Sequence, residues 1–570
     1  MTQPADPTAA PAPSASSSGP APVAAAPAAA EPAAAPAPAP EPAAPVAPPA
    51  PEDPTVAAVR AGYAFTGPAL ELGALVSGGE AVPTAQVRVP LGMLNRHGLV
   101  AGATGTGKTK TLQLMAEQLS LAGVPVFMAD IKGDLSGIGV PGAPSEKLSA
   151  RAASIGQEWV PTACPGEFLS LGGQGKGVPV RATVTSFGPT LLAKVLDLNE
   201  TQTSSLALVF HFADAAGLPL LDLKDLRSVV QFLISDEGKA DLEGLGGLSK
   251  ATAGVILREL IAFADAGAAV FFGEPEFDSH DLLRTSPDGH GVVTCLELPS
   301  VQDKPALFST FLLWLLADLF HDLPEAGDLD KPKLVFFFDE AHLLFKDAPK
   351  AFVDQITQTV RLIRSKGVGV FFVTQSPKDV HADVLAQLGN RVQHALRAYT
   401  PDDAKALKAA ASTFPKSAYD LEELLTTLGI GEAVVTVLSE RGAPTPVAWT
   451  RLRAPQSLMA PAPDATIDAT VAASPLLAEY GTALDRESAY ERLAAKLAPP
   501  PSAAPAPAKA PAPAPEPAPR RREEKEEPGV VTQVVTSTAF KSFLRSAGTV
   551  LGREITRSIF GTATKKRRRR

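Results

Sequence analysis

The stretch Gly102-Ala-Thr-Gly-Thr-Gly-Lys-Thr109 decides the fold that this sequence predicts. It matches the pattern G-x-x-x-x-G-K-[ST], in which a glycine-rich loop joins a strand to a helix. Its flanks fit, because residues 98–101 are apolar and apolar residues recur at helical spacing through residues 110–121. Such a loop points several backbone N–H groups and the positive end of a helix dipole at one polyphosphate. The sequence therefore predicts a binding site for a nucleoside triphosphate.

The side chains of this loop divide the work of holding ATP and Mg²⁺. Lys108 is expected to reach the β- and γ-phosphates, and the Thr109 hydroxyl is expected to ligate the metal ion. Lys108 is also expected to face solvent and phosphate rather than the core. The residues expected to bind ATP are Gly102, Ala103, Thr104, Gly105, Thr106, Gly107, Lys108, Thr109 and Lys110.

A second signal is the run Lys333–Glu340, in which five apolar residues precede two adjacent acids. A strand buried on both faces has no structural use for such acids, because burying unpaired carboxylates is costly. We interpret the pair as a Walker B element, in which Asp339 holds Mg²⁺ and Glu340 polarises the attacking water. An isolated Asp-Glu at a strand end would be ordinary, and the glycine loop upstream favours the catalytic interpretation.

Polar residues follow two other apolar runs that are expected to be strands. Gln375 comes after Val368–Val373 and is the candidate sensor of the γ-phosphate or its water, with a simple strand cap as the alternative. Asp130, Lys132 and Asp134 follow another run. Ligands of open α/β sheets gather at the carboxyl ends of the strands, so these three are candidates for the nucleotide or Mg²⁺ neighbourhood. An ordinary polar loop explains them equally well.

One arginine is a candidate for contributing to the site of a neighbouring subunit. Arg391 lies in Leu388–Leu396, which leads into a further expected strand. We interpret it as a trans arginine finger, and a surface salt bridge or a solvated face are the alternatives. Arg361, Arg364 and Arg397 are its rivals.

Composition separates an ordered core from its tails. Of the first 55 residues, 38 are Pro or Ala and none is aromatic, and a second Pro/Ala-rich run begins at residue 499. Such segments cannot bury enough apolar surface to offset the entropy of ordering, so we expect them to be disordered. About 440 residues remain between them, which is ample for a large core.

Charge, cysteines and hydropathy narrow the class of protein further. A net charge of −9 argues against a general nucleic-acid coat. Two cysteines without metal-binding spacing indicate a reducing compartment, and the start of the chain has no apolar segment of a signal peptide. The apolar run 306–320 would reach about 22 Å as a helix, short of a hydrocarbon core of about 30 Å. We therefore expect a cytoplasmic protein in which this helix is buried.

The pattern of apolar residues predicts the order of parts along the chain. Strand-like runs alternate with helical ones, which predicts an α/β fold with a mostly parallel sheet. Val178–Ser186 is expected to be a strand, a closing hairpin is expected at 432–438 and 445–449, and 56–89 is ambiguous apart from an edge strand at 87–89. The expected parts are a disordered tail at 1–55, an ATPase domain at 56–455 with a helical insertion at 190–285, a helical extension at 456–498, a Pro/Ala and charged linker at 499–528, and a basic amphipathic helix with its tail at 529–570.

That last segment carries apolar and basic residues on different faces of an expected helix. The apolar face is formed by Phe540, Phe543, Leu544, Ala547, Leu551, Ile555 and Ile559. The basic residues Lys541, Arg545, Arg553 and Arg557 lie on or beside the other face, before the basic end 565–570. Such a helix suits a membrane surface, nucleic acid or a protein partner, and docking back on this protein is the plain alternative.

Five stretches together carry a resemblance to a known family. Asn95–Thr109, Asp130–Gly137, Phe338–His342, Thr374–Pro377 and Leu388–Val392 resemble the HerA-like branch of the HerA/FtsK ATPase superfamily. More closely, they resemble its bacterial proteins with a HerA-like helicase C-terminal domain. The resemblance implies a RecA-like P-loop NTPase core, often assembled into hexameric rings that pump double-stranded DNA. No clear counterpart of the N-terminal β-barrel of archaeal members precedes the loop.

The resemblance also implies roles for particular residues. The family's P-loop residues map to Lys108 and Thr109, its Walker B acids to Asp339 and Glu340, its sensor glutamine to Gln375, and its finger arginine to Arg391. The first functional hypothesis is therefore a ring-forming, ATP-driven motor that acts on DNA. The second is a nucleotide-dependent scaffold or a membrane-associated switch ATPase that does not act on DNA. A small-molecule kinase ranks third, because Glu340 beside Asp339 fits water activation better than phosphate acceptance.

Overall fold

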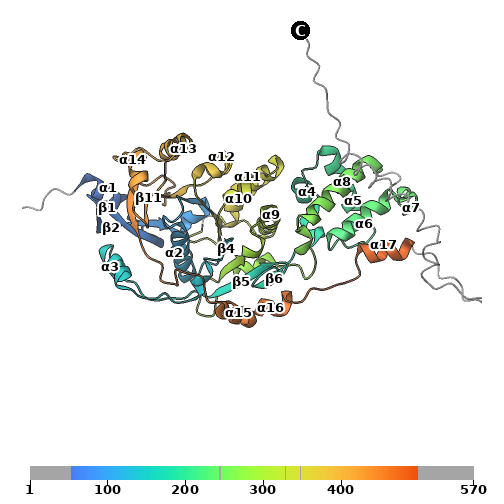
Figure 1. The fold of residues 1–570 in the computed structure, drawn as a ribbon, viewed down its shortest axis with the longest axis horizontal. Helices are drawn as coiled ribbons and strands as arrows, with labels where there is room; N and C mark the ends of the chain where they lie inside the picture. The colour runs from blue at the N-terminus through green and yellow to red at the C-terminus, as the bar shows by residue number, and fades with distance from the viewer. Residues whose placement is uncertain (1–52, 243–245, 328, 347, 498–570) are drawn as a thin grey trace, which may run out of the picture. The chain divides into compact units, whose positions relative to one another are not determined.

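The computed structural model describes residues 53–242, 246–327, 329–346 and 348–497. Within them the chain forms a 12-stranded sheet in the order β2-β1-β12-β11-β10-β3-β9-β8-β4-β7-β5-β6 (Figure 1). The strands are β1 Ala69–Ser77, β2 Glu80–Pro90, β3 Gly98–Ala101, β4 Val126–Asp130, β5 Gly166–Leu171, β6 Val178–Val180, β7 Val293–Glu297, β8 Leu334–Phe338, β9 Val368–Thr374, β10 Asn390–His394, β11 Glu432–Thr436 and β12 Ala448–Leu452. The expected tails, linker and C-terminal basic helix lie outside the described residues.

The sheet has a parallel part and an antiparallel part. The eight strands from β10 to β6 in the sheet order run parallel. β11, β12, β1 and β2 continue the sheet beyond β10 in antiparallel fashion. The predicted fold class, a RecA-like P-loop NTPase with a mostly parallel sheet and a helical insertion, is confirmed.

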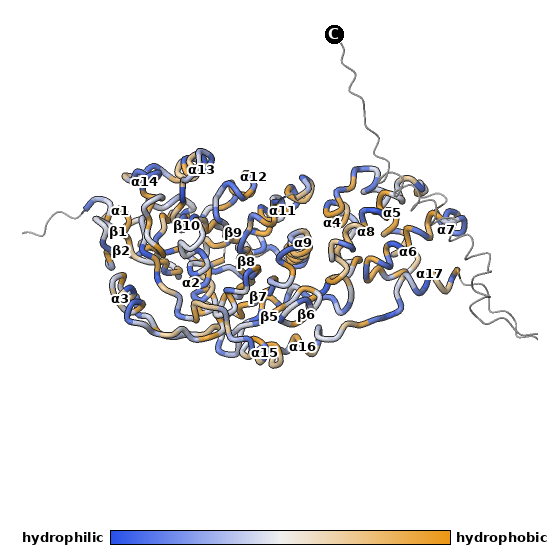
Figure 2. Tube along the Cα trace, viewed as in Figure 1, coloured by the Kyte–Doolittle hydropathy of each residue, from blue (hydrophilic) through white to orange (hydrophobic). Residues whose placement is uncertain are grey.

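The central strands are buried on both faces, which explains their continuous apolar runs. In β4, Phe127 contributes to one hydrophobic core and Met128 to another, and Phe336 and Phe337 of β8 divide in the same way. Figure 2 shows the apolar character of these strands. The helices that accompany the sheet are α1 Pro54–Gly62, α2 Lys108–Leu121, α3 Glu146–Ser154, α9 Pro305–Asp322, α10 His342–Phe345, α11 Lys350–Ile363, α12 Ala382–Leu385, α13 Pro401–Ser412 and α14 Leu421–Thr427.

A cluster of helices follows β6 in the sequence (Figure 1). It consists of α4 Val184–Val195, α5 Glu200–Ala215, α6 Leu223–Leu233, α7 Asp236–Asp241 and α8 Lys250–Asp265. Asn199 caps α5 with a capping box, and Ser249 caps α8 through the backbone N–H of Thr252, as their side chains predict. The helices form where the sequence predicts an insertion.

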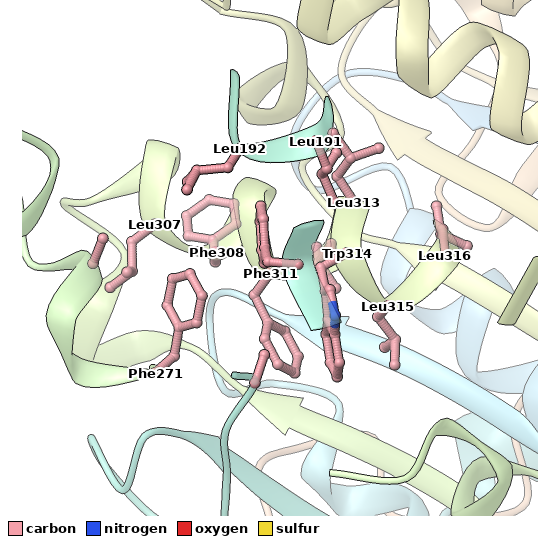
Figure 3. Packing of buried hydrophobic residues seen from close by; sticks show 14 of the residues in the cluster. Leu191, Leu192, Phe271, Leu307, Phe308, Phe311, Leu313, Trp314, Leu315 and Leu316 are labelled. Carbon is pink, nitrogen blue, oxygen red and sulfur yellow. The ribbon is translucent and has the colours of Figure 1, made fainter. Parts of the chain in front are cut away.

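The apolar helix α9 packs against α4 of this cluster. In Figure 3 its side chains Phe308, Phe311 and Trp314 pack in the same core as Leu191 and Leu192 of α4. The expectation of a buried helix is thus confirmed. None of the helices in the described ranges combines the length and the apolar character needed to cross a lipid bilayer.

Three expectations for individual elements differ from the structure. The strand expected at Val178–Ser186 ends at Val180, because the Thr183 side chain accepts a hydrogen bond from the Ser186 N–H and starts α4 there. β2 is an edge strand, as expected. Its partner β1 was not predicted, because its burial pattern does not alternate and the sequence therefore shows no strand periodicity there. The last strand, β12, begins three residues later than the expected 445–449.

The segment after β12 is helical in pieces. α15 Asp464–Ala473, α16 Pro475–Tyr480 and α17 Ala489–Leu497 are separated by short connections, so the helical expectation for 470–497 is wrong for 481–488. α15 packs against β5, α16 against β6 and α17 against α6. The expected boundary between a domain at 56–455 and an extension at 456–498 stays a prediction.

Candidate nucleotide site

The glycine loop between β3 and α2 needs glycine for two physical reasons. Gly105 and Gly107 have φ angles of 79° and 112°, which side chains other than glycine rarely adopt. At Gly102 an added Cβ would lie 2.4 Å from the Cβ of His394. The loop therefore keeps its tight curve, with α2 beginning at Lys108.

Lys108 lies folded over its own loop. Its Nζ donates hydrogen bonds to the carbonyl oxygens of Gly102 at 2.7 Å and Ala103 at 3.2 Å. The residue is buried, and burial lowers the pKa of its ammonium while the charges of Glu340 and Asp339 oppose that shift. The expectation that Lys108 faces solvent is wrong, because the residue is buried and the loop carbonyls accept hydrogen bonds from its ammonium.

The neighbouring residues of the loop are more accessible. Thr104 and Gly105 are exposed, while Thr109 and Lys110 in the first turn of α2 are half-buried. The Thr106 hydroxyl donates to the Ala103 carbonyl at 2.7 Å, which braces the loop from inside. This arrangement leaves Thr104 and Gly105 accessible to a phosphate chain, whereas Thr106 and Lys108 are buried.

Asp339 lies at the carboxyl end of β8, two strands from the loop in the sheet order. It is buried, and its Oδ2 makes no hydrogen bond to any described residue. Burial, together with the adjacent Glu340 charge, raises the pKa of Asp339 to about 7. A buried carboxylate oxygen without a partner is costly unless something pairs with it, and a divalent cation would do so.

The donor set fits Mg²⁺ rather than a metal held by protein alone. Among the described residues there is no group of three or more His, Cys, Asp or Glu side chains that could hold an ion. Mg²⁺ is commonly bound by one or two protein ligands, phosphate oxygens and waters. Asp339 and the Thr109 hydroxyl match that mode.

Glu340 is held in an unusual backbone conformation beside a lysine. Its φ angle is +47°, a region that costs about 1–3 kcal/mol for a residue other than glycine. Lys132 pairs with its Oε1, and His342 Nδ1 lies 3.1 Å from its Oε2. Burial by itself would raise the pKa of Glu340, but the Lys132 hydrogen bond and charge outweigh it and lower the pKa.

Asp130 has a structural role instead of the predicted ligand role. Its Oδ1 accepts the N–H of Gly133 at 2.7 Å, and its Oδ2 accepts the N–H of Leu135 at 2.8 Å. Burial raises the pKa of Asp130 to about 6 although these bonds oppose the shift. The polar-loop interpretation is correct for Asp130, and it is Lys132 on the same turn that reaches the Walker B pair.

Gln375 and Arg397 line one cavity with the glycine loop. The cavity has a volume of about 430 Å³, and Ala103 and Thr104 form part of its wall. Gln375 follows β9, whose Thr374 pairs with Ala101 of β3, so the sheet itself places the glutamine beside the loop. The sensor role of Gln375 stays a prediction.

The structure does not bring Arg391 to the loop within one chain. Arg391 pairs with Leu99 of β3 in the sheet, three residues before the loop begins. Its Nη1 donates to the carbonyl oxygen of Thr413 at 3.4 Å. A role for Arg391 therefore requires a second subunit, whereas the rival Arg397 lies beside the loop of its own chain.

Two buried residues near the site escaped sequence analysis. His394 lies beneath the loop with its Nε2 2.9 Å from the Thr111 hydroxyl, and burial lowers the pKa of its ring to about 3. Glu297 ends β7 beside Asp130, and burial with the Asp130 charge raises the pKa of Glu297 to about 8. Only the position of each residue at the end of a strand could have indicated that it lies near the site.

A second cavity adjoins the other side of the loop. It has a volume of about 390 Å³ and touches Gly107, Lys110 and Thr111. Much of its remaining wall is apolar, and Ile430 and Met459, which are 77% and 40% exposed, stand at it. A cavity of this kind, next to a polyphosphate site, could accept the flat base of a nucleotide.

The loop, the parallel sheet and the acids at its carboxyl edge define the class as a RecA-like P-loop NTPase. The family description "Helicase HerA-like C-terminal" matches residues 77–569. The chain belongs to this family. The resemblance predicted from its motifs is confirmed.

Curated relatives match parts of the chain. The "Probable helicase MJ1565" of Methanocaldococcus jannaschii is 33% identical over 114 residues, which are 20% of this chain and 21% of that protein. The "DNA double-strand break repair helicase HerA" of Saccharolobus solfataricus is 20% identical over 352 residues, which are 61% and 63% of the two chains. The chain thus spans less than two thirds of the length of these relatives.

Solved structures with a similar fold include two bacterial proteins. The "Bacterial conjugative coupling protein TrwBdeltaN70" has 16% identity and a TM-score of 0.44, over 69% of this chain and 97% of that one. VirB4 of Thermoanaerobacter pseudethanolicus has 16% identity and a TM-score of 0.43, over 68% and 96%.

Proposed function

We propose that the chain is an ATP-hydrolysing motor of the HerA/FtsK type that moves on or unwinds DNA as a hexameric ring. The observation that carries the proposal is the placement of Lys108 after β3 and of Asp339 and Glu340 after β8, at the same carboxyl edge of the parallel part of the sheet. The charges of both acids also oppose the lowering of the Lys108 pKa by burial. A phosphate-binding cation, a metal-binding acid and a water-activating acid are the parts that phosphoryl transfer to water needs.

In the proposed mechanism each residue acts on one part of ATP. Lys108 exchanges the carbonyl oxygens of Gly102 and Ala103 for the β- and γ-phosphates. Thr109 and Asp339 would hold Mg²⁺, and the ion would supply positive charge to the phosphate oxygens. Glu340 orients and polarises the attacking water.

Other groups of the chain position the two ends of the nucleotide. Gln375 contacts the γ-phosphate or the water from the cavity that it shares with Ala103 and Thr104. The cavity beside Gly107 and Lys110 receives the base.

The DNA substrate is proposed from family membership, because two of the relatives described above are named helicases and one of them a DNA repair helicase. The test is the rate of ATP hydrolysis by the full chain with and without duplex DNA. We expect duplex DNA to raise the rate several-fold. An unchanged rate would favour the alternative, a nucleotide-dependent scaffold or membrane-associated switch. The basic segment at 529–570 is proposed to contact a membrane surface, nucleic acid or a protein partner in either case.

The cellular location is proposed to be the cytoplasm. Cys164 and Cys295 are both free and buried, which suits a reducing compartment. The Cys164 thiol has a pKa raised by burial to about 12, so it stays protonated and unreactive at neutral pH.

A ring would let one subunit complete the site of the next. We propose Arg391 as that trans finger and expect Arg391→Ala to bind ATP normally while its turnover falls by more than about tenfold. Mixing it with Lys108→Ala should restore part of the activity, because some interfaces then hold an intact loop and an intact finger. The matched control is Arg397→Ala, which removes an arginine from the chain's own cavity and should not be rescued by the same mixture. Failure of co-assembled Arg391→Ala and Lys108→Ala to complement would exclude Arg391.

A further inference from the structure

Lys132 contacts Glu340 of the Walker B pair, although Lys132 belongs neither to the glycine loop motif nor to the Walker B motif. Its Nζ hydrogen-bonds and pairs with Glu340 Oε1. The side chain of Lys132 is 47% exposed, whereas that of Glu340 is 6% exposed. The carboxylate is therefore the fixed partner, and the lysine approaches it from the solvent side.

The backbone that carries Lys132 is anchored by hydrogen bonds, whereas its side chain is half-exposed. Asp130 Oδ1 accepts the N–H groups of Lys132 at 3.2 Å and Gly133 at 2.7 Å. Gly133 has a φ angle of 75°, which closes the turn. An anchored turn with a flexible, half-exposed side chain can present its ammonium at more than one place.

This ammonium lies near the expected phosphate position. Lys132 follows β4 and its ammonium contacts Glu340 at the end of β8, and in the sheet order β8 lies between β4 and the strands β9 and β3 that lead to the glycine loop. A triphosphate in the loop would bring several negative oxygens to this edge of the sheet. Lysine hydrogen bonds to phosphate are charge-assisted and strong.

The Lys132–Glu340 pair also occupies one oxygen of the proposed base. Glu340 Oε1 receives the Lys132 ammonium, while Oε2 lies 3.1 Å from His342 Nδ1 and makes no hydrogen bond to any described residue. Lys132 therefore has to leave Oε1 before that oxygen can take a proton from water.

We propose that Lys132 is a second phosphate-binding lysine, which pairs with Glu340 as the structure shows and moves to the γ-phosphate when ATP binds. The move couples recognition of the γ-phosphate to release of Glu340, so that ADP, which lacks that phosphate, leaves the pair intact. This inference rests on the proposed ATP site.

The test compares binding of ADP with binding of a non-hydrolysable ATP analogue that has an imido bridge before the γ-phosphate. Both dissociation constants are measured by calorimetry on the full chain with Mg²⁺. Lys132→Met should weaken binding of the analogue by about 10- to 100-fold and change binding of ADP by less than about threefold. Lys132→Arg should retain most of the preference for the analogue. The control is Lys224→Met, which removes an equally half-exposed lysine from its pair with Glu491 and should change neither constant.

A second variant tests the pair from the other side. Glu340→Gln weakens the resting pair and should bind the analogue at least as tightly as the unchanged chain does. Equal losses for both ligands in Lys132→Met, or no loss for either, would overturn the role of Lys132. If the unchanged chain bound neither ligand, the ATP site itself would be wrong, so the two failures are distinguishable.

Discussion

Lys108→Ala is expected to reduce ATP hydrolysis by more than about 10³-fold and to weaken ATP binding strongly. The ammonium of Lys108 lies directly at the loop, where it donates to the carbonyl oxygens of Gly102 and Ala103, and we expect it to bind the phosphates there. The fold should survive, because only the carbonyl oxygens of Gly102 and Ala103 lose a partner and the loop beside them is accessible to water.

The measurement is steady-state phosphate release together with ATP binding and thermal unfolding. Lys331→Ala is the matched control, because the Lys331 Nζ also donates to two backbone carbonyl oxygens, those of Ala122 at 2.8 Å and Gly123 at 3.4 Å. It should retain full activity. Normal turnover in Lys108→Ala would refute the assignment of the loop.

Glu340→Gln is expected to bind ATP and Mg²⁺ but to hydrolyse ATP about 10²–10⁴ times more slowly. Glutamine keeps the size of the side chain and its φ of +47°, but it cannot take a proton from water. Such a variant should also trap any ring that forms only with ATP bound.

Asp339→Asn should fail in a different way. The Asp339 Oδ2 has no partner within the described parts of the chain, and we assign it to Mg²⁺, so its loss should weaken Mg²⁺-dependent ATP binding. Binding with and without Mg²⁺, measured for both variants, separates the two roles. The proposed division fails if both variants lose binding to the same degree.

The sequence predicted the elements whose signal is local. The strand, the glycine-rich loop and the helix at Gly98–Leu121 were predicted because the signal for each lies in consecutive residues. The apolar run before Asp339 likewise predicted a central strand with its acids at the end, since a strand buried on both faces must be apolar throughout. Capping residues such as Asn199 marked helix starts correctly.

What the sequence could not predict depends on contacts between distant residues. Lys132 and Glu340 are 208 positions apart, and His394 meets Thr111 across 283 positions. Both contacts exist because the sheet order sets the ends of separate strands side by side, and strand order is not visible in a single pattern of apolar residues. The burial of Lys108 was mispredicted for a different, local reason, since its partners are nearby loop carbonyls whose direction only the folded turn defines.

The most direct measurement of the central claim is displacement of a third strand from a DNA triplex by the full chain. A motor that moves along duplex DNA pushes the third strand off, and it does so only while ATP is hydrolysed. We predict displacement by the unchanged chain with ATP and Mg²⁺, and none by Glu340→Gln or with the imido analogue. Steady ATP hydrolysis by the unchanged chain on the same triplex, with the third strand left in place, would contradict the account.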